Sequence, residues 1–154
     1  MSSLTHPVAV LASLVNGVAA GIMLSTVLGI APMFLALPYR QYVQTVQFLW
    51  HRYDPVMPFA NGTTLVLDVL LAVLVPAPVR FVFAAAAAAQ ATVMGISVTR
   101  NVPVNRYVYG LDPQREPVDW PARDPRRRWR NWNALRTSFA LAAFAANVIA
   151  TVMS

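Results

Sequence analysis

The chain has 154 residues, of which 57% are hydrophobic and only 12% charged, with a net charge of +6 and no cysteine. Soluble domains carry about 25% charged residues, so this composition indicates an integral membrane protein, and the lack of cysteine excludes disulfides, thiolate metal sites and dithiol redox chemistry. All 12 basic residues are arginines beside apolar runs, a distribution that fits membrane orientation better than nucleic-acid binding.

The first apolar segment predicts a membrane-spanning helix from about Val8 to Ile30, with Pro32 ending or kinking it. Its apolar stretch is too long for a signal peptide, so we expect it to be retained. Gly17, Gly21 and Ser25 recur every four residues on this helix. Small residues let helix backbones approach in lipid, so the stripe predicts a packing seam.

The segment 38–58 follows and mixes aromatic side chains with arginine, glutamine and histidine. This mixture predicts a short amphipathic helix that lies at the level of the lipid headgroups.

Three further apolar segments predict spanning helices at about 59–75, 79–98 and 128–152, and a long polar loop at 100–125 precedes the last of them. The fold class is therefore all-α: an integral membrane four-helix bundle, with the interfacial helix between helices one and two. We expect residues 1–154 to form a single membrane domain.

Arginine bias predicts the orientation of the bundle. The first connecting segment holds Arg40 and Arg52, and eight arginines lie in the last loop and its flanks, whereas the opposite side holds only Arg80. Both large loops should face the cytoplasm, with the termini outside, in a membrane that we expect to be the bacterial inner (plasma) membrane.

Each predicted span contains a polar residue. Asp68 and Gln90 should lie at similar depth near the midplane, and Asn16 and Asn147 nearer the outer side. Such groups form interhelical hydrogen bonds or serve a function. Asp68 is either a neutral carboxyl bonded to a neighbour or a proton acceptor.

Histidine offers little for a metal site. The predicted topology puts His6 and His51 on opposite sides of the membrane, which excludes a haem held by paired intramembrane histidines. A P-loop and a dinucleotide-binding glycine motif are also absent from the sequence.

The start of the last helix carries the densest group of candidate residues. Trp129, Asn133 and Arg136 share one helical face, Thr137 continues it, and Trp132 lies four residues before Arg136. The preceding arginines, 126–128, are predicted headgroup anchors. Arg136 lies about two turns further in, and it either snorkels to the surface or points into the bundle.

Asn101 and Asn105 flank Pro103 where the third helix reaches the same membrane face. We expect Pro103 to hold the segment extended and to stop the helix. The asparagines either cap freed backbone groups or supply hydrogen-bond donors beside Arg136. In the second case a cavity with a donor cluster at one end would accept an apolar ligand with one or two oxygens. Three tryptophans would form its walls: Trp120, Trp129 and Trp132.

The order of these motifs is Asn101-x-Pro-x-Asn105, then Trp120 in a proline- and acid-containing loop, then Trp129-x-x-Trp132-Asn133-x-x-Arg136-Thr137. Over essentially the whole chain it resembles the anthrone oxygenase-like family of small four-helix membrane proteins. The chain departs from that family's pattern at Asn133, where many members have histidine.

The resemblance implies oxidation of an anthrone to an anthraquinone by dioxygen, with a lipophilic, polyketide-like aromatic as substrate. We expect no cofactor beyond the co-substrate dioxygen, and the sequence leaves a bound metal open. It assigns Arg136, Asn101 and Asn105 to stabilising the enolate oxyanion. Substrate binding falls to the three tryptophans with Asn133 and Thr137. The general base is either Asp68 or an acid of the last loop such as Asp119.

Other functions fit the same sequence. A cyclase or another tailoring enzyme on a lipophilic natural product would use the same cavity. A small proton-coupled exporter would use Asp68 as its coupling site, and a membrane scaffold would have no ligand site. Besides the lipid bilayer and the substrate, a second copy of the chain is a possible partner, and no nucleic acid is expected.

Overall fold

A computed structural model describes residues 4–153. The described chain is helical and contains four helical stretches long and apolar enough to cross a membrane. The helices are α1 (Thr5–Ser25), α2 (Ala31–Ala36), α3 (Tyr39–Tyr53), α4 (Val56–Leu74), α5 (Val79–Ile96), α6 (Val102–Tyr109), α7 (Trp120–Arg123) and α8 (Arg126–Val152). The predicted all-α bundle is therefore confirmed.

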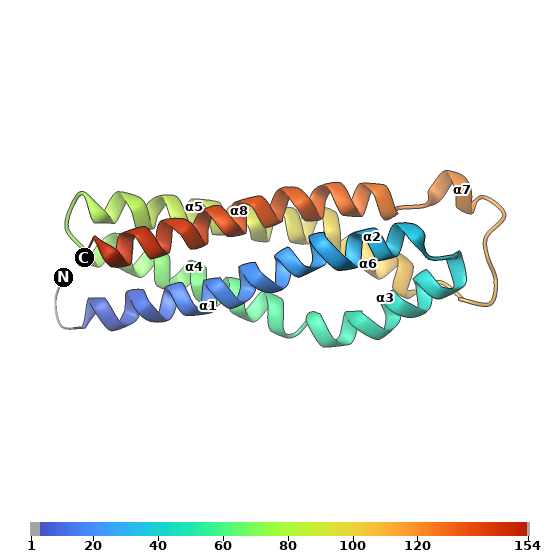
Figure 1. Ribbon diagram of the computed structural model, residues 1–154, viewed down its shortest axis with the longest axis horizontal. Coiled ribbons are helices and arrows are strands. Elements are labelled where there is room, and N and C mark those ends of the chain that lie inside the picture. The colour runs from blue at the N-terminus through green and yellow to red at the C-terminus, as the bar shows by residue number, and fades with distance from the viewer. Residues whose placement is uncertain (1–3, 154) are drawn as a thin grey trace.

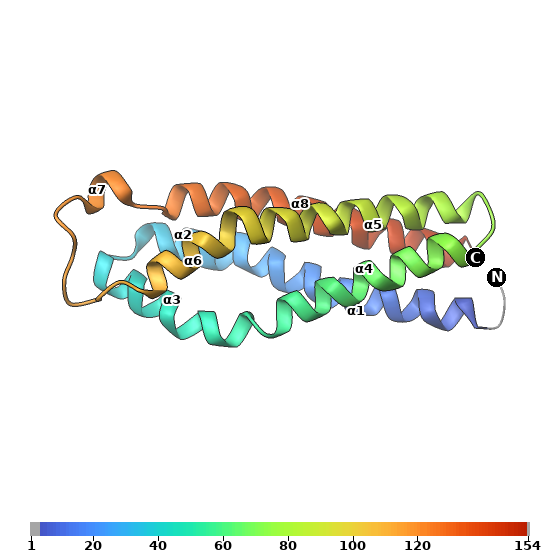
Figure 2. The same cartoon turned by 180° about the vertical axis from the view of Figure 1, so that it is seen from behind.

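The long helices α1, α4, α5 and α8 lie side by side in an elongated bundle (Figure 1). α1 begins and α8 ends at the same end, where the turn between α4 and α5 also lies. The shorter helices α2, α3, α6 and α7 gather at the other end (Figure 2). The bundle thus has an elaborated end, where the four short helices lie, and an opposite end formed by the ends of the long helices and the turn between α4 and α5.

Two of the spanning helices are longer than predicted because each continues through a π-helical turn. The first turn is Thr26–Ile30, after which α2 carries the chain past Pro32. The second is Ser97–Asn101, after which α6 contains Pro103. The prediction that Pro103 holds an extended segment is therefore wrong. A proline in the first turn of a helix needs no partner for its missing N–H, so both prolines are accommodated.

The seam of small residues on α1 is narrower than predicted. A Cβ on Gly17 would approach Phe144 of α8 to 2.9 Å, whereas a Cβ on Gly21 would meet nothing within 4 Å. Only Gly17 of these two therefore permits close helix packing.

The segment predicted to be an interfacial helix forms α3, and it is packed against α6 and the following loop. Gln47 Nε2 donates to the carbonyl oxygens of Tyr109 and Leu111, both at 3.0 Å. His51 Nε2 and the Tyr109 hydroxyl are 2.7 Å apart. These bonds attach α3 to the end of α6.

Arg126 differs from the arginines that follow it. Its Nη1 donates to the carbonyl oxygens of Phe34 at 3.0 Å and Leu37 at 2.6 Å, and the rest of its guanidinium pairs with Asp124. The prediction that Arg126 is a headgroup anchor is wrong, because it satisfies carbonyls that the end of α2 leaves free. Arg127 and Arg128 are exposed.

Candidate active-site pocket

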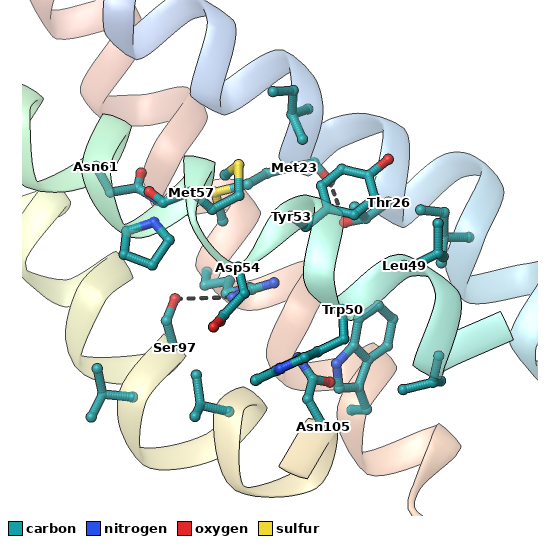
Figure 3. Close-up of a pocket in the computed structure, with 18 of the residues that line it drawn as sticks. Met23, Thr26, Leu49, Trp50, Tyr53, Asp54, Met57, Asn61, Ser97 and Asn105 are labelled. Atoms are coloured by element: carbon teal, nitrogen blue, oxygen red, sulfur yellow. Dashed lines mark hydrogen bonds between the residues drawn. The ribbon is translucent and has the colours of Figure 1, made fainter. Parts of the chain in front are cut away.

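A cavity of about 170 Å³ lies at the elaborated end of the bundle. Figure 3 shows its lining, to which both π-helical turns, the ends of α1 and α5, and α2, α3, α4, α6 and α8 contribute. Most of the lining is apolar or aromatic. The polar lining residues are Thr26, Asp54, Asn61, Ser97, Asn105 and Arg136.

Arg136 projects from α8 into this pocket. Of the two orientations that the sequence left open, it therefore points into the bundle and does not snorkel to the surface. Its Nη1 donates to the Ser97 hydroxyl at 3.0 Å (dashed line in Figure 3). Its Nε and Nη2 both donate to Asn133 Oδ1, at 3.1 and 2.9 Å. Among residues 4–153 no carboxylate lies within ion-pair distance of it. The pocket therefore contains a cation held by neutral groups.

Asn133 and Thr137 lie behind Arg136 and outside the pocket lining. Asn133 is fully buried, and its Nδ2 donates to the Thr26 hydroxyl at 2.9 Å. Thr137 donates back to the Asn133 carbonyl oxygen at 2.7 Å. Asn133 thus supports the guanidinium directly, whereas Thr137 bonds only to backbone carbonyls, and both lie apart from the space that a substrate would fill.

The two asparagines of the Asn101–Asn105 motif lie in different surroundings. Asn105 lines the pocket, whereas Asn101 is fully buried beside it and its Nδ2 donates to the Trp129 carbonyl oxygen at 3.3 Å. Asn101 therefore joins the second π-helical turn to α8. Only Asn105 is in a position to reach a ligand.

The three tryptophans predicted to form the cavity walls also lie in different surroundings. Trp129 lines the pocket. Trp120 is buried away from it, with its ring 4.8 Å from that of Tyr39 and 6.1 Å from that of Tyr42. Burial in this cluster raises the pKa of the Tyr42 hydroxyl, and the nearby Asp124 raises it further. Trp132 stacks instead under the guanidinium of Arg100, 4.9 Å from the ring centre.

Neither acid proposed as the base lies in the pocket. Asp119 is paired with Arg123 at 2.6 Å in the loop. Asp68 is fully buried further along α4 and accepts a hydrogen bond from Asn147 Nδ2 at 3.3 Å. The carboxylate that does line the pocket is Asp54, an exposed residue at the junction of α3 and α4.

The depth predicted for Gln90 is also corrected. Gln90 Nε2 donates to Asn61 Oδ1 at 2.6 Å, and Asn61 lines the pocket. Gln90 therefore lies at the level of the pocket floor. Asp68 lies about two turns away along α4, at the level of Asn147.

Sequence reasoning missed the contribution of α3 and of the first π-helical turn. Trp50, Tyr53 and Asp54 line the pocket from the end of α3, and Thr26 from the turn. The mixed composition of segment 38–58 predicts only a membrane-surface helix. Its signal was the clustering of Trp50, Tyr53 and Asp54 at one end, which suits a binding site as well as an interface.

Comparison with known proteins adds a family to this geometry. No curated protein and no solved structure matches the chain significantly. The family model described as Anthrone oxygenase matches residues 47–146, a stretch that runs from the second half of α3 to within two turns of the end of α8 and includes Asp54, Asn105 and Arg136. The match covers most of the chain and agrees with the motif order noted in the sequence, so the chain belongs to the anthrone oxygenase family.

Proposed function

We propose that this protein is a membrane enzyme that uses dioxygen to oxidise the activated methylene of a lipophilic, anthrone-type aromatic to a carbonyl. The observation that carries the proposal is Arg136, a guanidinium in an aromatic-walled pocket that neutral groups hold and no carboxylate neutralises within the described chain. A cation at such a depth is costly unless an anion joins it. An enolate or phenolate oxygen of the substrate supplies that anion.

The walls suit a flat aromatic body. Trp50, Tyr53 and Trp129 contribute ring surfaces, and methionine and aliphatic side chains fill the remainder. Aromatic rings stack against one another in offset or edge-to-face arrangements. Burial of the substrate body therefore supports binding, while Arg136 and Asn105 orient its oxygens.

Asp54 is the base in this proposal. Its carboxylate removes a proton from the methylene carbon, and the electron pair left behind spreads into the adjacent carbonyl as an enolate. Arg136 stabilises the developing oxyanion. A general base in hydrogen-bond reach of the carbon acid lowers the barrier further.

Dioxygen then adds to the enolate carbon, and the peroxide anion takes up the proton that Asp54 holds. Loss of the second methylene proton breaks the O–O bond, forms the carbonyl and releases water. The balance is one CH₂ and one O₂ converted into one C=O and one H₂O. The residues bind the substrate, move the protons and stabilise charge.

The alternatives make different demands on the same residues. A scaffold without a ligand site predicts Arg136 among the headgroups, whereas it lines a pocket. An exporter coupled through Asp68 needs that carboxyl beside the transported molecule, whereas Asp68 lies outside the pocket lining. A tailoring enzyme of another class remains the second candidate, because the same pocket would bind its substrate.

The test is dioxygen uptake by the detergent-purified protein supplied with a hydroxylated anthrone, with background autoxidation subtracted and the quinone product measured by chromatography. Uptake by the wild type that is lost in Arg136→Gln supports the proposal. Uptake no faster than background, with binding of the anthrone retained, would overturn the oxidation and leave a different reaction at this pocket.

A further inference from the structure

A second polar group lies in the bundle, away from the pocket. It consists of Asn16 on α1, Asp68 on α4 and Asn147 on α8, and all three side chains are 0% exposed. The Asn147 amide donates to one carboxylate oxygen of Asp68, Oδ2, at 3.3 Å. None of the three lines the pocket.

Helix register places these three residues in one layer. The neighbouring layer is an apolar cluster to which all three helices contribute: Ala12, Leu71 and Ala150. Asn16, Asp68 and Asn147 each lie about one turn from the cluster residue on their own helix. α1 runs opposite to α4 and α8 (Figure 1). Asn16, Asp68 and Asn147 therefore all lie on the pocket side of the apolar cluster. The hydrogen bond between Ser13 and Thr151 fixes the same register for α1 and α8.

The layer leaves several buried polar atoms without a partner. Within residues 4–153, no hydrogen bond reaches Asp68 Oδ1, Asn147 Oδ1, Asn16 Oδ1 or Asn16 Nδ2. An unpaired buried polar atom costs about 1–3 kcal/mol. Three unpaired oxygens and one N–H₂ group on three packed helices therefore provide the polar partners that a small polar guest needs.

Asp68 also has no cationic partner among residues 4–153. The described chain offers it no ion pair, and the nearest arginine on α8, Arg136, lies about three turns away. The apolar cluster around Ala12, Leu71 and Ala150 lies on one side, and buried Thr64 lies about one turn from Asp68 on the other. An apolar cluster of Ala20, Met23, Val93 and Ala140 lies further toward the pocket. A guest that neutralises the carboxylate is therefore favoured over one that only forms hydrogen bonds.

We propose that Asp68, Asn147 and Asn16 bind a monovalent cation of the Na⁺ type. Carboxylate and amide oxygens are hard ligands that suit hard cations. A single carboxylate balances one positive charge, whereas a divalent ion would leave a net charge at membrane depth. The free Asn16 N–H₂ group then donates to a carboxylate oxygen. The site would bind together α1, α4 and α8.

The experiment is thermal unfolding of the full-length protein in detergent at one fixed pH, in NaCl or in choline chloride at equal ionic strength. We expect Na⁺ to raise Tm by roughly 5 °C or more at saturation, because a ligand stabilises the state that binds it. Asp68→Asn and Asn147→Ala should abolish the Na⁺ response. Gln90→Ala, which removes another buried amide, should lower Tm but retain that response.

Direct binding of radioactive sodium to the wild-type protein keeps the test independent of whether the variants fold. Saturable binding near one ion per chain supports the site. Equal Tm in the two salts, no saturable binding, or an unchanged Na⁺ response in Asp68→Asn overturns it, and the layer then holds water or a protonated carboxyl. The oxidation assay is not affected by any of these outcomes.

Discussion

Asn133 holds Arg136 through a single oxygen: the Nε and Nη2 atoms of the guanidinium both donate to Asn133 Oδ1, at 3.1 and 2.9 Å. The other side of the amide donates to Thr26 at 2.9 Å. Asn133 is thus a neutral group that positions a cation. A side-chain amide does not act as a base at physiological pH, so the base has to come from elsewhere in the pocket.

Replacing Asn133 tests this positioning role. Asn133→Ala should lower kcat by about 10-fold or more, because Arg136 loses its support while its charge remains. Asn133→Asp should lower it further, because a carboxylate in contact with Arg136 neutralises the charge intended for the substrate. Steady-state dioxygen uptake measures both. Equal rates in wild type and Asn133→Asp would rule out the oxyanion role of Arg136.

Arg136→Gln should reduce kcat/KM for the anthrone by about 100- to 1,000-fold, the usual loss when a donor to a developing oxyanion is removed. Arg136→Lys should retain part of the activity, because lysine keeps the positive charge but lacks the planar guanidinium that donates to Asn133 and Ser97. Product formation by chromatography gives the comparison. A Lys variant no better than the Gln variant would show that geometry, not charge alone, is required.

Asp54→Asn should lower kcat by about 100-fold or more, because general bases contribute on that order. The matched control is Asp119→Asn, which removes a carboxylate that pairs with Arg123 outside the pocket and should leave kcat within about twofold. Comparable losses in the two variants would mean that Asp54 is not the base.

Gly17→Val and Gly21→Val differ only in what the new side chain meets. A side chain at Gly17 would press on Phe144, whereas one at Gly21 enters open space. We expect Gly17→Val to destabilise the bundle by about 1–3 kcal/mol, as overpacking does, and Gly21→Val to be nearly neutral. Thermal unfolding in detergent measures the difference. Equal Tm values would show that α1 and α8 separate to accept the side chain.

Arg126→Ala should lower stability by about 1–3 kcal/mol, because the carbonyl oxygens of Phe34 and Leu37 lose their donor. Arg128→Ala is the control, since Arg128 is exposed, and surface charges contribute little. Thermal unfolding with limited proteolysis of the loop between α6 and α8 would report the effect. No difference between the variants would mean that Arg126 acts only as a surface charge.

The fold was predictable because apolar length alone specifies spanning helices. Helical periodicity also puts Arg136 and Trp129 on one face with Asn133, although it left open whether Arg136 points into the bundle or to the surface. In each case local sequence determines the result.

Asp54 and Trp50 were not predictable in the same way. They lie more than 80 residues from Arg136 in sequence, and only the docking of α3 against α6 and α4 brings them to the pocket. The roles of Trp120 and Arg126 were missed for the same reason, because each is set by tertiary contacts with Tyr39, Tyr42 and the end of α2. Motif spacing carries no information on such contacts.

The two π-helical turns at Thr26–Ile30 and Ser97–Asn101 have a consequence for how this pocket could be lost. Each wider turn holds one residue more than an α-helix needs, and one residue corresponds to about 100° of rotation about the axis. Deleting one residue from either turn would swing every side chain beyond it, Phe34 on α2 or Asn105 on α6, away from Arg136. The bundle would keep its four spans and every pocket residue in its sequence, yet the cavity would be gone.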